Sequence, residues 1–354
     1  MLCVKRAAGF CLVSVSLLVA CACSDLTAGR LSYASEASNI LAKYALTGAV
    51  WPVLDPSIIR QGSTYYSFST DVEGFSRSGH LPIHCSQDKV SWTLCGSVFP
   101  GGIPAWVSSD VPGIKGLWAP DISYFAGLYH VYYCGSTLGS NRTVIGLATN
   151  TTLDPNDPAY QWVDRGLVLE SGPGDNFNAL DPNIFVDTDG SVWLNYGSYW
   201  SGIKQQQIAP VTGMLLDSNP QVYDLATRPG VPHNPIEGAS MVRHGQYYYL
   251  FVSVDYCCKS AWVQDNYKEA VGRSDNPHGV FADEDGTPMI AGGGTVLLEG
   301  NTQWNAPGGG TAYVDNSTGD SLFIFHAQDV SRKGVPFQWL DTLTWVNGWP
   351  VLSN

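Results

Sequence analysis

Residues Asp181 to Ser198 read Asp-Pro-Asn-Ile-Phe-Val-Asp-Thr-Asp-Gly-Ser-Val-Trp-Leu-Asn-Tyr-Gly-Ser. A carboxylate comes first, and the apolar segment Ile184 to Val186 follows it. Asp189-Gly190 then predicts a tight turn, because this dipeptide tolerates the left-handed backbone that hairpin turns need. A second apolar segment, Val192 to Tyr196, ends in Gly-Ser. The stretch therefore predicts a β-hairpin with an acid at its start.

The same unit recurs along the chain. Four copies begin at Asp55, Asp121, Asp181 and Glu237, and a weaker fifth, Gly309 to His326, begins with glycine. The four acids lie 66, 60 and 56 residues apart. A repeat of this length, built from strands and turns, is typical of a propeller with four-stranded blades. We therefore expect an all-β fold, a five-bladed β-propeller, in which each copy forms the two inner strands of a blade. The alternative is a β-sandwich with chance similarity, which five copies of one pattern disfavour.

The amino terminus has the features of an export signal. Lys5 and Arg6 precede an apolar run from Ala7 to Ala20, and Ala20-Cys21-Ala22 fits a cleavage site. The run is shorter than a membrane-spanning helix requires. We expect residues 1–22 to be a signal peptide, residues 23–47 a lead-in, and residues 48–354 one catalytic propeller domain. The protein would then be secreted, whereas the alternative, a lipoprotein signal, would attach lipid to Cys21 and anchor it to a membrane.

The charge balance excludes one class of partner. The chain has 18 Lys and Arg against 31 Asp and Glu, a formal net charge of −13. Nucleic acid binding is disfavoured, because phosphates require a basic surface. The 12 Trp and 18 Tyr suit a β-rich fold and the stacking of rings on sugars, although core packing accounts for most of them. We expect an extracellular monomer with a neutral ligand.

Five cysteines lie beyond the leader region: Cys85, Cys95, Cys134, Cys257 and Cys258. No pair has the spacing of a zinc site. Cys85 and Cys95 flank a predicted hairpin and could pair in an oxidising compartment. The adjacent Cys257 and Cys258 could form a vicinal bridge or remain two small buried residues, so the pairing stays open.

Three acids have a sequence context that suits catalysis. Proline follows Asp55 and Asp181, and glycine follows Glu237, so the backbone is either fixed or open to close approach. Carboxyls that converge on one pocket repel each other, and their pKa values then separate. Glycoside hydrolysis needs such a pair, a protonated acid for the leaving oxygen and an ionised base for water. A single Asp-Pro is better explained as a strand cap or a calcium ligand, whereas three acids at one repeat position favour catalysis. Asp121 has the same repeat position, so spacing alone does not select the three.

A set of longer motifs carries a family resemblance. They are Asp55-Pro-Ser, Leu117-Trp-Ala-Pro-Asp-Ile122, Gly139-Ser, Ile145-Gly-Leu-Ala-Thr149, Asn178-Ala-Leu-Asp-Pro-Asn183, Gly197-Ser-Tyr-Trp200, Glu237-Gly-Ala-Ser, Cys257-Cys258, Gly292-Gly-Gly-Thr295, Ala306-Pro-Gly-Gly309, Phe325-His-Ala327 and Trp349-Pro-Val351. From about Asp55 to Val351 the chain resembles glycoside hydrolase family 43. Within the family it is most similar to endo-1,5-α-L-arabinanases, those of fungi in particular.

The resemblance implies the catalytic roles. It implies a five-bladed propeller and inversion at the anomeric carbon, with Asp55 as general base and Glu237 as general acid. Asp181 would tune the pKa of the acid and orient it, and Asp121 would be a structural acid behind Trp118. Inversion requires the base and acid carboxyls to lie about 6.5–9.5 Å apart, so that a water molecule fits between sugar and base.

The resemblance also implies ligand contacts. The implied sugar-binding residues are Trp118, Gly139, Asn178, Ala179, Leu180, Ser198, Tyr199 and Trp200. For the tryptophans the alternative is core packing. His326 would help to hold one calcium ion, with waters, in the central channel. A hydrogen-bonded histidine is the alternative there, because calcium prefers oxygen ligands.

Two departures from the family pattern touch the pocket rim. Leu54 stands where many arabinanases have His, and Gly308-Gly309-Gly310 stands where fungal relatives have Gly-Gly-Gln. They leave the preferred linkage and chain length open. We expect a secreted hydrolase of internal α-1,5 bonds in arabinan, a pectin side chain. The alternatives are an exo-acting α-L-arabinofuranosidase or a β-xylosidase of the same family, and a non-catalytic carbohydrate-binding propeller. A fructan hydrolase would have Arg before its Asp-Pro, where this chain has Leu180.

Overall fold

The computed structural model describes residues 32–38, 44–75, 79–258, 265–315 and 317–352. The predicted signal peptide, Cys21 and part of the lead-in lie outside the described residues. The regular structure is mostly strand, and the helical segments are short: α1 (Ala105–Asp110), η1 (Met289–Ala291) and η2 (Val330–Arg332). Within the described ranges, no helix combines the length and the apolar character needed to cross a membrane.

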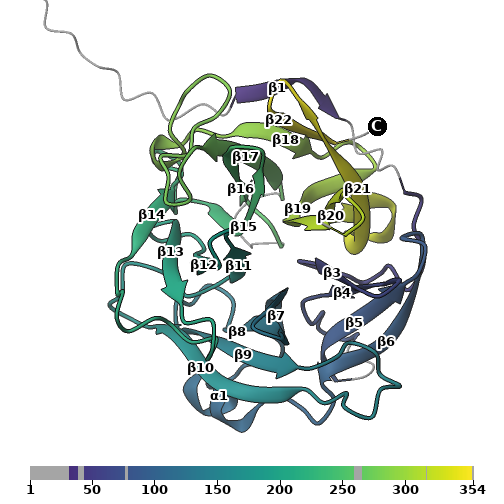
Figure 1. Cartoon of the computed structure of the whole chain (residues 1–354). Coiled ribbons are helices and arrows are strands. Elements are labelled where there is room, and N and C mark those ends of the chain that lie inside the picture. Colours follow the sequence, from purple (N-terminus) through teal and green to yellow (C-terminus); the bar gives the residue numbers. More distant parts are fainter. Residues whose placement is uncertain (1–31, 39–43, 76–78, 259–264, 316, 353–354) are drawn as a thin grey trace, which may run out of the picture.

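The strands form five sheets around a central axis (Figure 1). The first sheet contains β2 (Thr47–Gly48), β3 (Ser57–Gln61), β4 (Thr64–Phe68), β5 (His80–Ser86) and β6 (Ser91–Phe99). The second contains β7 (Leu117–Phe125), β8 (Leu128–Gly135), β9 (Thr143–Asn150) and β10 (Val163–Ser171). The third contains β11 (Asn183–Val186), β12 (Val192–Tyr196), β13 (Ile203–Ile208) and β14 (Tyr223–Ala226). The fourth contains β1 (Ser32–Ser38), β15 (Ile236–His244), β16 (Tyr247–Val254), β17 (Lys268–Ser274) and β18 (Thr295–Glu299). The fifth contains β19 (Trp304–Asp315), β20 (Asp320–Asp329), β21 (Val335–Val346) and β22 (Trp349–Leu352).

The inner strands close a ring. Each inner strand contacts the next in the order β3, β7, β11, β15, β19, and β19 contacts β3. The prediction of an all-β, five-bladed propeller is therefore confirmed. Each predicted repeat supplies the two inner strands of its blade, as in the third blade, where Ile184 pairs with Leu194 across β11 and β12. The acids at the start of the repeats consequently lie at the axial end of the inner strands.

Hydrogen bonds join the fifth blade to the first. The Ser67 hydroxyl donates to the side-chain Oε1 of Gln338 at 2.9 Å, and the backbone N–H of Gln338 donates to the Val50 carbonyl at 2.8 Å. The Arg60 guanidinium pairs with Asp315 at 3.1 Å. Part of the predicted lead-in also forms a strand, because β1 pairs in parallel with β18 at the outer edge of the fourth sheet.

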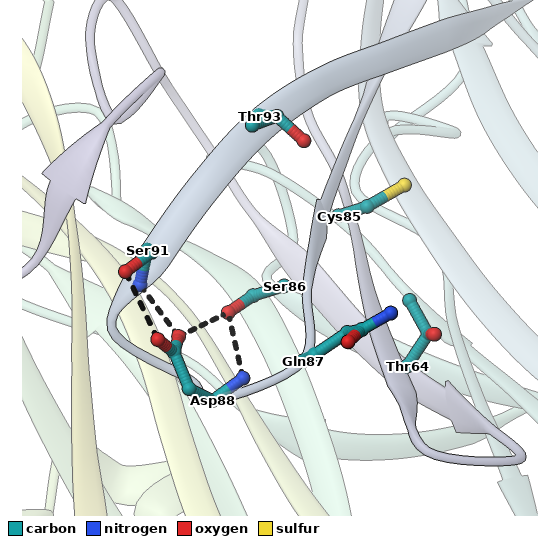
Figure 2. A pocket seen from close by; sticks show the side chains of 7 residues that line it. All are labelled: Thr64, Cys85, Ser86, Gln87, Asp88, Ser91 and Thr93. Atoms are coloured by element: carbon teal, nitrogen blue, oxygen red, sulfur yellow. Dashed lines mark hydrogen bonds between the residues drawn. The ribbon is translucent and has the colours of Figure 1, made fainter.

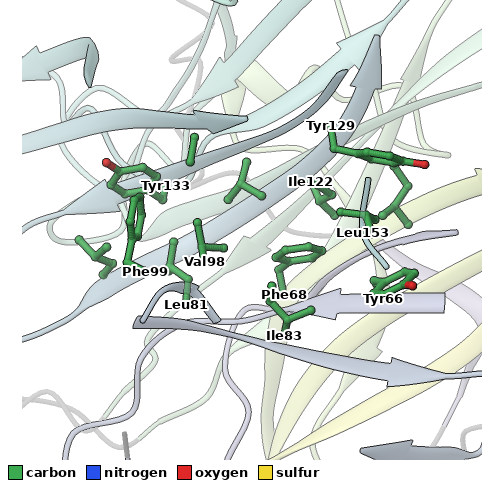
Figure 3. Packing of buried hydrophobic residues seen from close by; sticks show 14 of the residues in the cluster. Tyr66, Phe68, Leu81, Ile83, Val98, Phe99, Ile122, Tyr129, Tyr133 and Leu153 are labelled. Atoms are coloured by element: carbon green, nitrogen blue, oxygen red, sulfur yellow. The ribbon is translucent and has the colours of Figure 1, made fainter. Parts of the chain in front are cut away.

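Apolar side chains fill the space between neighbouring blades. Between the first and second blades, Phe68 and Val98 pack with Val131 and Tyr133, all at most 1% exposed (Figure 3). Fully burying such a side chain contributes roughly 1.5–3 kcal/mol. Most of the aromatic residues thus serve the core, in agreement with the sequence interpretation.

The structure shows how the cysteines of the described residues pair. Cys85 and Cys95 form a disulfide between β5 and β6, with their Cα atoms 6.0 Å apart. Cys257 and Cys258 form a vicinal disulfide, and Cys134 is free and buried.

A shallow pocket opens beside the hairpin of β5 and β6 (Figure 2). Asp88 accepts hydrogen bonds from the side chain and backbone of Ser91, at 2.9 and 2.7 Å, and thereby fixes the turn. None of the predicted site residues lines this pocket, so it is not the candidate active site.

Candidate active site

The same strained turn begins the inner strand of every blade. Asp55, Ala119, Asp181 and Ala306 have φ angles of 46°, 44°, 53° and 48°, and proline follows each of them. In the fourth blade, Gly238 has the corresponding φ of 60°. Positive φ is unfavourable for residues with a Cβ atom, so it persists only where the surrounding fold imposes it. The turn therefore provides a reference position for comparing blades.

Measured from this turn, the four acids are not equivalent. Asp55 and Asp181 occupy the left-handed position itself, Glu237 lies one residue before it, and Asp121 lies two residues after Ala119. The prediction of one shared repeat position is therefore wrong for Glu237 and Asp121. The reason is a register shift in the second and fourth blades, between Trp118 and Asp121 and between Glu237 and Ser240, which sequence spacing does not reveal.

Asp121 is consequently held between blades. Its side chain is 5% exposed, and it accepts hydrogen bonds from the Asn183 side chain at 3.1 Å and the Ile184 amide at 2.8 Å. Burial raises the pKa of Asp121 to about 7. These contacts tie the second blade to the third, so the side chain is structural.

Asp55 is held by two groups from other parts of the chain, Thr70 and His326. The Thr70 hydroxyl donates to Asp55 Oδ2 at 2.6 Å and accepts the Ala119 amide at 2.7 Å. The Asp55 amide donates to Nδ1 of His326 at 3.2 Å. Burial raises the pKa of Asp55 to about 6, against the opposing effect of the Thr70 hydrogen bond. Above that pH the carboxyl is ionised, as a general base must be.

Glu237 and Asp181 form the other half of the cluster. Ser198 donates to Glu237 Oε2 at 2.6 Å, and Tyr267 donates to Oε1 at 2.8 Å. The Gly238 amide donates to Asp181 Oδ2 at 3.0 Å. Burial is the main cause that raises the pKa of Glu237, and it raises the pKa of Asp181 well above its usual range.

The three acids lie close enough for their charges to raise pKa values within the cluster. Repulsion from Glu237 and Asp55 adds to the effect of burial on the pKa of Asp181, and repulsion from Asp55 also raises that of Glu237. A like charge in the same site disfavours ionisation, so such shifts indicate neighbouring carboxyls. The ring thus brings carboxyls from the first, third and fourth blades to one mouth, and their pairing favours keeping a proton on the Asp181–Glu237 pair.

Several predicted sugar-binding residues surround this cluster. Ser198 is 3% exposed and bonds to Glu237, while Tyr199 and Trp200 follow it with φ angles of 55° and 32°. Trp200 is 40% exposed, and the Asn234 side chain donates to its carbonyl at 2.9 Å. Trp200 is thus a partly exposed aromatic residue two positions after Ser198, which bonds to Glu237.

The remaining predicted contacts are more varied. Trp118 is partly buried against the core, and Gly139 is exposed in a loop with φ 77°. The Leu180 carbonyl accepts the Gly197 amide at 2.7 Å. Asn178 accepts the Thr143 hydroxyl at 2.8 Å and is 3% exposed, and Ala179 is 0% exposed within the core. The Ala179 methyl group packs inside the protein, and the sugar contact of this residue stays a prediction.

His326 is the predicted metal ligand. It is 0% exposed, and burial lowers its pKa to about 3, so the ring is neutral. Its Nδ1 atom accepts the Asp55 amide, and its Nε2 atom has no hydrogen-bond partner among the described residues. Over the same residues, no group of three His, Cys, Asp or Glu side chains could hold a metal. The site fits calcium only as one nitrogen ligand in a shell completed by water.

Sequence reasoning missed two residues that hold the acids, Thr70 and Tyr267. A signal for Thr70 exists, because every one of the first four repeats ends in a hydroxyl residue: Thr70, Ser136, Ser198 and Ser253. In the first repeat that residue faces the acid that begins it. Tyr267 precedes the third strand of the fourth blade, and its approach to Glu237 depends on the curvature of the whole blade.

Comparison with known proteins agrees with this geometry. The sequence model described as Glycosyl hydrolases family 43 matches residues 51–350. An extracellular endo-α-(1→5)-L-arabinanase of Bacillus subtilis is 37% identical over 84% of this chain and 86% of its own length. An extracellular exo-α-(1→5)-L-arabinofuranosidase of Cellvibrio japonicus is 33% identical over 91% and 92%. The structure of a Cellvibrio cellulosa α-L-arabinanase complexed with arabinohexaose has a TM-score of 0.77 and 33% identity, and covers 85% of this chain and 95% of its own. The match over most of the chain, together with the propeller and its acidic mouth, shows that the chain belongs to glycosyl hydrolase family 43.

Proposed function

We propose that the protein is a secreted glycoside hydrolase that cleaves internal α-1,5-L-arabinofuranosidic bonds of arabinan with inversion. The observation that carries this proposal is the meeting of Asp55, Asp181 and Glu237, whose pKa values are all raised. Two similar proteins are named as extracellular enzymes that act on α-1,5-linked arabinose polymers or their ends. That likeness supports both the substrate and secretion.

In the proposed reaction, Asp55 removes a proton from water, and that water attacks the anomeric carbon. Glu237 gives its proton to the departing glycosidic oxygen, so the bond breaks with inversion. Asp181 is the proposed partner of Glu237: it accepts the neighbouring Gly238 amide at 3.0 Å, and the Glu237 charge raises its pKa. Asp55 suits the base because its pKa of about 6 leaves it ionised at neutral pH, and the Thr70 hydroxyl supports that form.

Calcium bound at His326 Nε2 remains part of the proposal. The ion would supply positive charge near the cluster and so favour the ionised carboxylates. His326 would be its protein ligand, and waters would complete the shell. The neutral state of the ring is the form that ligates metals, which supports this assignment.

The second candidate function is exo action on the same bonds. The similarity to a named exo-α-(1→5)-L-arabinofuranosidase favours it. The two modes differ in their first products. An endo enzyme releases mixed oligosaccharides from debranched arabinan early in the reaction, whereas an exo enzyme releases one short product throughout.

The test uses purified protein and debranched arabinan, with products sized over time. Wild type should give mixed oligosaccharides first, and Glu237→Gln should abolish hydrolysis while keeping the wild-type unfolding temperature and binding to arabino-oligosaccharides. Nuclear magnetic resonance of the first-formed anomer reports inversion. Absence of hydrolysis by wild type would support a carbohydrate-binding propeller instead.

A further inference from the structure

A second buried glutamate lies behind the acidic cluster. Glu269, on β17, is 0% exposed, and within the described residues no Lys, Arg or His pairs with it. Burying a carboxyl without a cation is costly, so its presence calls for compensating contacts. The reaction proposed above does not use it.

Strand register aligns this residue with the proposed acid. Glu237 on β15 pairs with Ser253 on β16, and Ser253 pairs with Glu269 on β17. Side chains at directly paired positions lie on the same face of a sheet. The three residues therefore form one lateral row, with Glu237 next to the axis and Glu269 two strands away.

Hydrogen bonds follow this row. Ser253 donates to Glu269 Oε1 at 2.9 Å, and its side chain also lies beside the hydroxyl of Tyr267 and lowers the pKa of that group. Tyr267, 3% exposed, donates to Glu237 Oε1 at 2.8 Å. A row of contacts thus runs from Glu269 through Ser253 and Tyr267 to the acid, with a hydrogen bond at each end.

Glu269, at the outer end of this row of contacts, also accepts a hydrogen bond from the backbone. The Gly310 amide donates to Glu269 Oε1 at 2.7 Å. A Cβ atom at Gly310 would lie 2.7 Å from Glu269 Oε1 and 2.3 Å from the Phe323 ring, so a larger residue there would displace the carboxyl. Glycine at position 310 therefore leaves room for the Glu269 carboxyl.

We propose that Glu269 is a positioning residue for Glu237, acting through Ser253 and Tyr267. It does not touch the substrate. It holds Ser253 in place beside the Tyr267 hydroxyl, which fixes the direction of the Glu237 carboxyl. Burial raises the pKa of Glu269 to about 8, so below that pH its neutral form adds no further repulsion to the cluster. The inference rests on the proposed function, because it assigns Glu237 the role of acid.

A leaving-group comparison tests this role. Protonation by an acid matters for a sugar leaving group and little for nitrophenolate, which departs without a proton. Glu269→Ala should lower kcat on arabinohexaose roughly tenfold or more, with KM within about twofold, the size expected for a lost positioning hydrogen bond. On a 4-nitrophenyl glycoside of arabinotriose, kcat should change less than about threefold.

Three further variants separate positioning from general loss of structure. Glu269→Gln keeps an acceptor for Ser253 and Gly310 and should restore most of kcat. Ser253→Ala removes the side chain between Glu269 and Tyr267, so it should also lower kcat on arabinohexaose more than kcat on the nitrophenyl glycoside. This variant provides the test if Glu269→Ala folds poorly. Asp283→Ala is the matched control, because Asp283 is 3% exposed and accepts the amides of Thr287 and Gly294 at 2.8 and 3.1 Å. It should lower the unfolding temperature without changing the ratio of kcat on the two substrates.

The outcomes test the positioning role of Glu269 separately from the assignment of Glu237 as the acid. Equal losses on both substrates, or no loss of kcat in folded Glu269→Ala and Ser253→Ala, would overturn the positioning role while leaving the hydrolase intact. Full activity of Glu237→Gln on arabinohexaose would remove the assignment of the acid, and the role of Glu269 with it.

Discussion

Replacing Thr70 with Val tests the assignment of Asp55 as base. Val has the shape of Thr but no hydroxyl, so Asp55 Oδ2 loses a donor at 2.6 Å and the Ala119 amide loses an acceptor at 2.7 Å. A hydrogen bond to a charged group contributes about 1.5–3 kcal/mol. At about 1.36 kcal/mol per unit, the pKa of Asp55 should rise by roughly one to two units.

The sign of the pH effect follows from the role of the residue. The base must be ionised, so kcat/KM falls as the pH drops through the pKa of Asp55, which is about 6 in the wild type. In Thr70→Val, the acidic limb should move upward to about pH 7–8. At pH 7 the ionised fraction would drop from about 90% to between roughly 10 and 50%.

The assay is the pH profile of kcat/KM on arabinohexaose at a fixed calcium concentration. Thr70→Ser keeps the hydroxyl and is the control, with an acidic limb close to that of wild type. The unfolding free energy of Thr70→Val should also fall by about 1–3 kcal/mol, because the Ala119 amide is left without a partner. An unshifted acidic limb in a folded Thr70→Val protein would refute the assignment of Asp55.

Three other predictions follow from the structure. Burial raises the pKa of Asp121 to about 7, so its ionisation destabilises the folded state, and the unfolding free energy of the wild type should fall between about pH 4 and 7. Asp121→Asn should reduce this pH dependence in urea unfolding, and an unchanged pH dependence would contradict the burial effect. Trp200→Ala should raise KM for arabinohexaose roughly fivefold or more with little change in kcat, because Trp200 is 40% exposed and lies two residues after Ser198, which bonds to Glu237. An unchanged KM would place the sugar elsewhere. Removing calcium with a chelator should lower the activity of the wild type, and added calcium should restore it, whereas the activity of His326→Gln should change with neither treatment. Calorimetric titration with calcium measures binding independently, and no binding by the wild type would end the calcium proposal.

The sequence predicted the blade count and the principal acids because both depend on local patterns. Alternating apolar strands, turn residues and an acid at the head of four of the five repeats can be recognised along the chain, and strand pairing then follows from proximity. Asp55, Asp181 and Glu237 are recognisable for the same reason, although the family resemblance rather than spacing separated them from Asp121.

Only the tertiary structure decided which side chains face the pocket. The register shifts near Trp118 and Glu237 move Asp121 into the contact between blades and place Glu237 one residue away from the left-handed turn. The partners of the acids, Thr70 and Tyr267, reach them from 15 and 30 residues away. Repeat spacing fixes which strands are neighbours, whereas a shift of one residue within a strand moves every side chain beyond it to the other face of the sheet. That direction depends on how the five blades close on one another, and no local pattern records it.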